Sequence, residues 1–139
     1  MTAAAVGKAA IRASFARQGM MRTLGAEMRA VGGGTCVVEA PIRAETGQQH
    51  GFAHAGLAFA IGDSAAGYAA LSAMPEGAEV LTVEMKINLL APAAGERLVA
   101  TGRVVRAGRR VVVVTADVEA EAAGARRLVA LLQGTMIPA

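Results

Sequence analysis

Asp63 is the residue of this 139-residue chain whose surroundings in the sequence most favour a chemical role. It falls within an Ala-rich apolar segment, residues 55–73, and no Lys or Arg lies three or four positions away to pair with it on a helix. An unpaired carboxylate is costly to bury on so apolar a helix. A solvent-facing polar stripe is the alternative, but the only other polar side chains there are Ser64, Tyr68 and Ser72. The pattern therefore favours a functional carboxylate.

The residues just before this segment, 48–56, lead into the predicted start of the same helix. Backbone N–H groups near Ala55 and Gly56 have no acceptor within the helix, and they point outward with the positive end of the helix dipole. Such donors polarise a carbonyl or stabilise an oxyanion. Together with a carboxylate they are the two parts that an ester or thioester hydrolase needs.

The spacing of these two parts predicts a dimer. Ala55 and Asp63 are eight residues apart, so on one regular helix they lie about 12 Å apart along the axis. That distance is too long for both to act on one carbonyl group. Two copies of the helix, antiparallel across a two-fold axis, would bring Asp63 of one chain to Ala55 of the other.

Two histidines, His50 and His54, raise the alternative of a metal site. They have the spacing of a helical zinc-binding pair, but Gly51 disfavours a helix there and no third ligand is near in the sequence. We therefore expect structural hydrogen bonds at the loop-to-helix junction and no metal. Cys36 is the only cysteine, which excludes a disulfide within one chain and predicts a reducing, cytoplasmic location.

The elements that must position these residues follow from hydrophobic periodicity. We expect an N-terminal helical region over residues 1–22, in which residues 7–22 form the helix. A long central helix is expected at 55–73. Alternation of apolar and polar residues predicts strands at 23–29, 35–43, 81–89, 97–106, 109–121 and 126–136. Four successive strands after one long helix indicate an α+β fold, an antiparallel sheet with the helix on its apolar face, in a single domain over residues 1–139.

Composition excludes several classes of protein. Hydrophobic residues make up 54% of the chain and charged residues 18%, which is typical of a folded domain rather than a disordered one. With 3% aromatic residues and no Trp, the chain lacks the stacking platforms of single-strand binders, so we expect no nucleic-acid partner. The longest apolar stretch, 52–74, is interrupted by His54 and Asp63, and we expect no membrane span.

The order His50-Gly51-x-x-His54-Ala55-Gly56, six residues, then Asp63-Ser64-Ala65-Ala66-Gly67-Tyr68 resembles the signature of the hotdog-fold acyl-CoA thioesterases. The resemblance is to their PaaI-like branch, named for phenylacetic acid degradation. It extends over about residues 20–137 and includes the segment 81–92, Gly95 and Gly134-Thr135.

The resemblance implies a long central helix wrapped by a curved antiparallel sheet, in a homodimer and often a homotetramer. It implies hydrolysis of acyl- or aryl-coenzyme A thioesters without a metal or cofactor. Asp63 would be the nucleophile or general base, and the Ala55 N–H would polarise the thioester carbonyl from the opposite subunit. His54 would support the loop, Gln48 would orient water or substrate, and Thr82 would place the attacking water. Expected substrate contacts are Gly56, His50, Phe52 and Asn88.

Two departures from the family pattern keep an alternative open. Family members more often have Gly at the position of Ala55 and Asn at that of Gln48. A non-catalytic module of the same fold that holds acyl-CoA without cleaving it is therefore the alternative function. The preferred acyl group, whether short, medium, long or aromatic, is left open.

Other residues have a functional and a structural interpretation. Phe52, Phe59 and Tyr68 are candidates for a pocket wall, although for Phe59 we expect packing in the core. Six arginines are candidate contacts for the coenzyme A phosphates, although Arg is also common at solvated sheet edges and turns: Arg103, Arg106, Arg109, Arg110, Arg126 and Arg127.

Overall fold

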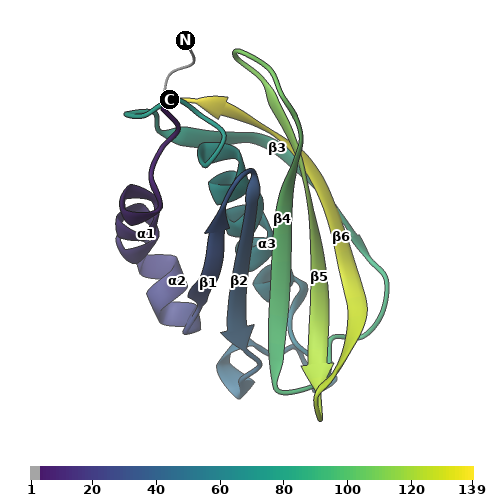
Figure 1. Cartoon of the computed structure of the whole chain (residues 1–139). Coiled ribbons are helices and arrows are strands. Elements are labelled where there is room, and N and C mark those ends of the chain that lie inside the picture. Colours follow the sequence, from purple (N-terminus) through teal and green to yellow (C-terminus); the bar gives the residue numbers. More distant parts are fainter. Residues whose placement is uncertain (1–3) are drawn as a thin grey trace.

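A computed structural model describes residues 4–139 and shows a curved antiparallel sheet wrapped around one long helix (Figure 1). The sheet has six strands in the order β1-β2-β4-β5-β6-β3. The long helix is α3 (Ala55–Leu71), and two short helices, α1 (Lys8–Ala16) and α2 (Gly19–Leu24), precede the sheet. The strands are β1 (Glu27–Gly32), β2 (Thr35–Pro41), β3 (Val80–Leu89), β4 (Arg97–Ala107), β5 (Val112–Ala122) and β6 (Ala125–Pro138). The predicted α+β fold is confirmed.

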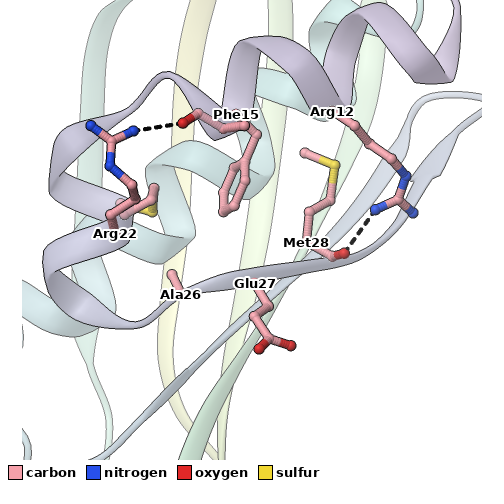
Figure 2. A pocket seen from close by; sticks show the side chains of 8 residues that line it. Arg12, Phe15, Arg22, Ala26, Glu27 and Met28 are labelled. Carbon is pink, nitrogen blue, oxygen red and sulfur yellow. Dashed lines mark hydrogen bonds between the residues drawn. The ribbon is translucent and has the colours of Figure 1, made fainter.

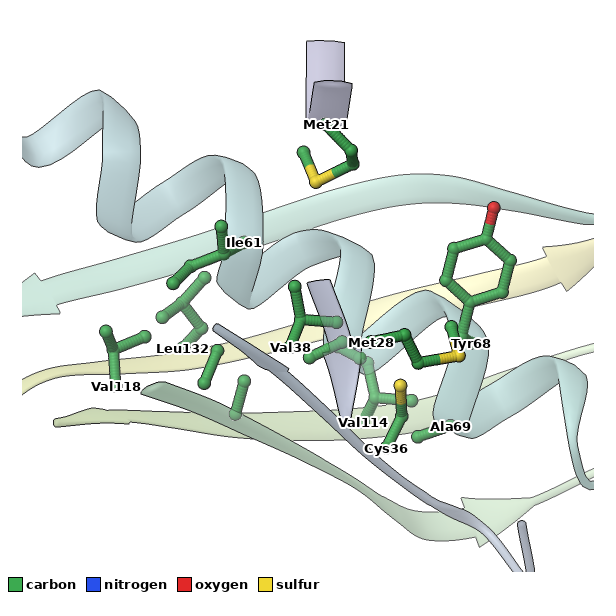
Figure 3. Close-up of a cluster of buried hydrophobic side chains, with 14 of the residues drawn as sticks. Met21, Met28, Cys36, Val38, Ile61, Tyr68, Ala69, Val114, Val118 and Leu132 are labelled. Carbon is green, nitrogen blue, oxygen red and sulfur yellow. The ribbon is translucent and has the colours of Figure 1, made fainter. Parts of the chain in front are cut away.

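The core lies between α3 and the concave face of the sheet (Figure 3). Strand β5 alternates strictly between buried and half-buried residues along most of its length, and its inward side chains include Val114 and Val118. They pack with Ile61 of α3 and Leu132 of β6. Since the sheet curves around the helix, 12 of the 17 residues of α3 are buried, and only a narrow side of the helix is left open.

Small residues allow α3 to approach the sheet closely. A side chain at Gly102 of β4 would place its Cβ 2.4 Å from the backbone of Ala65 in α3. No side chain fits at that distance, so the helix and the strand meet through backbone atoms at this point.

Gly102→Ala is therefore expected to destabilise the fold by about 1–3 kcal/mol, because the added methyl group must push α3 away from the sheet. Urea unfolding followed by circular dichroism measures the change in the free energy of unfolding. Gly19→Ala is the matched control: its Cβ would make only an ordinary contact, 3.6 Å from Arg22, and its stability should stay within about 0.5 kcal/mol of the parent. Equal stability of the two variants would contradict this packing.

The N-terminal region differs from the single helix expected over 7–22. Gln18 has an extended backbone, with φ −77° and ψ 105°, and separates α1 from α2. Helix α2 then continues to Leu24 and ends at Gly25 in the left-handed conformation, φ 68°. The strand expected from residue 23 therefore begins at Glu27. Residues 1–3 of the expected helical region lie outside the described residues.

Two arginines hold the α1–α2 segment in place: Arg12 ties it to the edge strand β1, and Arg22 links α2 back to the end of α1 (Figure 2). Arg12 Nη1 donates to the carbonyl of Met28 at 2.9 Å, and Arg22 Nη1 donates to that of Ala16 at 2.6 Å. They lie at a hollow of about 430 Å³ between the two helices and β1. The segment is thus fixed where it passes over the C-terminal half of α3.

The later elements follow the sequence pattern with small shifts at their ends. Helix α3 starts at Ala55 as expected and ends at Leu71 rather than residue 73, where Ser72 Oγ donates to the carbonyl of Ala69 at 2.7 Å. Strands β4 and β5 form the expected hairpin, but β5 begins at Val112 because Gly108 and Val111 close the turn with a hydrogen bond of 2.9 Å. Of the described helices, none is long and apolar enough to cross a membrane.

Candidate active site

Asp63 lies half-buried on the open side of α3, at a small pocket between the helix, the α1–α2 segment and the start of β3. Its Oδ1 accepts a hydrogen bond of 2.8 Å from Thr82 Oγ1. No Lys or Arg of the described residues forms an ion pair with it. Burial raises the pKa of Asp63 above its ordinary value, and the Thr82 hydrogen bond partly opposes that rise. A partly desolvated carboxylate without a countercharge is suited to proton transfer or nucleophilic attack.

The Asp63 pocket encloses about 230 Å³. Its walls come from four parts of the chain that are far apart in sequence: the α1–α2 segment, the second half of α3, the start of β3 and Met136 of β6. The lining residues with polar side chains are Ser14, Gln18, Asp63, Ser64, Tyr68, Glu79 and Thr82.

At the start of α3, His54 is the N-cap residue. Its Nδ1 accepts from the Gly56 N–H at 2.8 Å, and its carbonyl accepts from the Leu57 N–H at 3.0 Å. Among the described residues, no acceptor is found for the Ala55 N–H. The cap thus leaves this amide as the donor available to a ligand, at the positive end of the helix dipole.

Ala55 has an ordinary helical backbone, so the alanine side chain at a position where the family more often has glycine causes no strain. Ala55 is the first residue of the α-helix, and the one described non-glycine residue with a positive φ is Ala123. A methyl group is therefore compatible with the local backbone, and the N–H is presented as a glycine would present it.

Gln48 is fixed by the loop that precedes α3. Its Oε1 accepts from the backbone N–H of His50 at 2.5 Å and from that of Phe52 at 3.4 Å. With the oxygen engaged in the loop, the Nε2 group is the end left to donate outward. The side chain of Gln48 is one carbon longer than that of Asn, and its oxygen uses this length to accept hydrogen bonds from the loop.

A second, larger pocket of about 620 Å³ lies at this end of α3, and we call it the helix-start pocket. It is lined by Gln48, Gln49, His50, Phe52, Ala53, His54, Ala55, Ala58, Leu89, Leu90, Ala91, Pro92, Ala93, Val129 and Ala130. Within one chain, the predicted site residues therefore fall into two groups: Asp63 with Thr82, and Gln48, His50, Phe52, His54 and Ala55.

One sequence-based expectation about these residues is wrong, and another stays a prediction. Asn88 lies on the opposite face of β3 from the helix, at a hollow shared with Glu84 and Lys86, because alternation along the strand turns Met85 and Ile87 toward the core. Its contact with substrate stays a prediction. Phe59, expected in the core, is 37% exposed on the open side of α3. Gly56 is exposed, but its N–H is occupied by the His54 cap.

Sequence reasoning missed Ser14, Gln18 and Ser64 as residues of the Asp63 pocket. Gln18 Nε2 donates to the Tyr68 hydroxyl at 2.8 Å, and Ser14 Oγ lies 3.0 Å from the same hydroxyl. These pairs are 50 and 54 residues apart in sequence, so no local spacing could reveal them. One feature of the sequence could have indicated a role for Ser14 and Gln18: they are uncharged polar residues in a segment whose other polar residues are mostly basic.

A long central helix wrapped by a curved antiparallel sheet defines the hotdog fold, and the carboxylate and free helix-start amide lie on its open helix side. The chain belongs to the thioesterase superfamily, whose family model matches residues 50–124. The predicted hotdog thioesterase family is thus confirmed.

Solved structures agree with this assignment. The chain is 44% identical to a thioesterase family protein from Silicibacter pomeroyi, with a TM-score of 0.90 over 92% of this chain and 94% of that one. A conserved protein from Pseudomonas aeruginosa is 30% identical, with a TM-score of 0.80 over 88% and 94%. The PaaI protein of the E. coli phenylacetic acid degradation operon shares the fold at 24% identity, with a TM-score of 0.79 over 91% and 88%. Among curated proteins, none matches the chain.

Proposed function

We propose that the protein hydrolyses acyl- or aryl-coenzyme A thioesters to the free acid and coenzyme A, in a site shared between two chains of a homodimer. The observation that carries the proposal is the position of two groups on one side of α3. Asp63 has no cationic partner among the described residues and lies at one end of that side, and the unbonded Ala55 N–H lies at the other.

The open side of α3 is suited to contact with its own copy. Its exposed or half-buried residues recur at helical spacing and, apart from Phe59 and Asp63, are small: Ala55, Gly56, Phe59, Ala60 and Asp63. Phe59 is midway between Ala55 and Asp63. A second helix placed antiparallel, with the two-fold axis near Phe59, sets Asp63 opposite Ala55 of the partner subunit.

Strand β3 supports the same arrangement. It is an edge strand that pairs with β6 on one side, and it exposes Leu81, Val83 and Leu89. An edge of this length and hydrophobicity is a template for pairing with another strand. Antiparallel pairing of β3 with its own copy brings the Thr82 end of one strand to the Leu89 end of the other, so the Asp63 pocket of one chain meets the helix-start pocket of its partner.

In the mechanism we propose, the Ala55 N–H of one subunit donates to the thioester carbonyl oxygen and stabilises the negative charge that develops on it. Asp63 of the other subunit acts in one of two ways. As a general base, it takes a proton from a water whose oxygen attacks the carbonyl carbon. The C–S bond then breaks, and the thiolate of coenzyme A takes up that proton. As a nucleophile, a carboxylate oxygen attacks the carbonyl carbon, and the C–S bond breaks to release the thiolate of coenzyme A. Water then hydrolyses the resulting mixed anhydride, which frees the acid and regenerates the Asp63 carboxylate, while the thiolate takes up the released proton.

The remaining residues position these groups. Thr82 holds one carboxylate oxygen and leaves the other for water or substrate. Gln48 directs its Nε2 into the helix-start pocket, where His50 and Phe52 would contact the coenzyme A arm, and His54 fixes the helix start. Arg103 and Arg126 pair with Asp117 and Glu121, so we propose that the phosphates meet the other candidates, Arg106, Arg109, Arg110 and Arg127. Two such dimers would form a homotetramer.

Thr82→Val is expected to move the acidic limb of the kcat/KM profile to higher pH. The active form of Asp63 is the carboxylate, so activity falls as the pH drops through the pKa of Asp63. The Thr82 hydrogen bond lowers that pKa, and its loss raises the pH at which activity is lost. Steady-state rates across the acidic range measure the shift. An unchanged or lower midpoint would contradict the assigned contact.

A panel of coenzyme A thioesters, monitored by release of free thiol, tests the proposed function. Steady turnover of at least one thioester is expected. Binding of acyl-CoA with no thiol release would instead identify the non-catalytic module of the same fold.

A further inference from the structure

The wall of the Asp63 pocket contains a connected set of uncharged polar side chains. Tyr68 is 5% exposed, and its hydroxyl accepts from Gln18 Nε2 at 2.8 Å and lies 3.0 Å from Ser14 Oγ. Ser64 Oγ donates to Gln18 Oε1 at 3.4 Å. Gln18 is thus held at both ends of its amide, on the α1–α2 junction that passes over α3.

The Tyr68 side of this set is rigid. The Tyr68 ring packs edge-on against Phe15, with ring centroids 5.9 Å apart, and α1 and α2 are anchored to the sheet by Arg12 and by buried Ile11 and Met21. The hydroxyl therefore stays in place and orients the amide of Gln18. That amide keeps one further N–H and one further lone pair, which together match a hydroxyl group.

The charge and the volume of the Asp63 pocket limit which acyl groups it can hold. Its charged lining residues are Asp63 and Glu79, and no Lys or Arg is among the described lining residues. An acyl group with its own carboxylate would meet like charge there. The volume of about 230 Å³ is below the range of about 300–1,000 Å³ of pockets for drug-sized ligands, which disfavours a long alkyl chain.

We infer that Gln18 is a specificity-determining residue, and that the Asp63 pocket selects short acyl groups bearing a neutral hydroxyl. This inference rests on the proposed thioesterase function and names its substrate class. Gln18 touches the acyl group, whereas Tyr68 and Ser14 are positioning residues that act through it.

Matched pairs of substrates test the inference: butyryl- against 3-hydroxybutyryl-CoA, and hexanoyl- against 3-hydroxyhexanoyl-CoA, with succinyl- and octanoyl-CoA added. The protein should hydrolyse the hydroxylated member of each pair with a kcat/KM about three- to tenfold higher, the selectivity that one or two neutral hydrogen bonds provide. Succinyl- and octanoyl-CoA should be the poorest substrates.

Gln18→Leu removes both hydrogen-bonding groups of the amide, with a side chain one carbon shorter, and should abolish or reverse this preference, mainly through KM. Tyr68→Phe keeps the ring against Phe15 and should reduce the preference about two- to threefold, as loss of one neutral hydrogen bond predicts. If Gln18→Leu folds poorly, the substrate ratio of Tyr68→Phe alone tests the inference. Gln133→Leu, on an exposed position of β6 outside this pocket, is the matched control and should keep the parent ratio.

The outcomes separate the inference from the function on which it rests. If no thioester is hydrolysed, the proposed function fails and the inference with it. Hydrolysis with equal or better use of the alkyl substrates overturns the inference alone. The inference alone is also overturned if Gln18→Leu and Tyr68→Phe both fold and both keep the parent ratio of kcat/KM between hydroxylated and alkyl substrates.

Discussion

Asp63→Asn is expected to lower kcat/KM toward every thioester that the protein cleaves by about 10²–10⁴-fold, the usual contribution of a general base. The substitution preserves shape and keeps an oxygen that accepts the Thr82 hydrogen bond, so the fold should be retained. What is lost is the negative charge, without which the side chain neither removes a proton from water nor attacks a carbonyl. Thiol release at saturating and limiting substrate gives kcat and kcat/KM separately.

Asp117→Asn is the control for this experiment. Asp117 is on β5 and pairs with Arg103 at 3.3 Å, outside both pockets. The same chemical change there should alter kcat/KM less than about twofold, as for surface substitutions away from the site. An Asp63→Asn variant that keeps turnover close to that of Asp117→Asn would remove Asp63 from the chemical step.

Ala55→Pro removes the proposed carbonyl-polarising donor and is expected to lower kcat by about 10²–10³-fold, the usual effect of losing one oxyanion-stabilising donor. Ala55 is the first residue of α3, a position where proline is well tolerated in helices. His54 already has φ −64° and ψ 144°, which a following proline permits. The helix should therefore form, and thermal unfolding should confirm that the fold survives.

Lys8→Pro is the matched control, because Lys8 is the first residue of α1 and follows Gly7 with φ −74° and ψ 155°. It introduces the same ring at the same helical position outside both pockets. Normal activity of Lys8→Pro beside a large loss in Ala55→Pro ties the effect to the Ala55 amide. Equal activity of the two variants would show that this N–H does not act on the substrate.

The central features of the site could be predicted because they depend on local sequence. Asp63 stands out as an unpaired carboxylate within an apolar helix, and the structure shows it half-buried with a raised pKa. His54, predicted to form a hydrogen bond at the loop-to-helix junction, caps α3 through Gly56. The spacing of Ala55 and Asp63 on one helix fixed their separation before any tertiary contact was known.

Features that depend on tertiary contacts could not be predicted. The polar wall of the Asp63 pocket joins Gln18 to Tyr68 across 50 residues, through a break between α1 and α2 that hydrophobic periodicity did not indicate. The irregularity of β3 between Thr82 and Glu84 likewise has no signature in the regular alternation of apolar and polar residues along that strand. Phe59 appeared to be a core residue because an apolar side chain on the open side of a helix has the same sequence pattern as one buried within the chain.

Mixing the two inactive variants is the most direct test of a site shared between chains. In a hybrid dimer of Asp63→Asn with Ala55→Pro, one site carries both defects and the other combines an intact Asp63 with an intact Ala55 amide. After subunit exchange, the mixture should recover about a quarter of parental activity, because half of the dimers are hybrids with one working site in two. If each chain instead carries its own complete site, the mixture will stay as inactive as its two components.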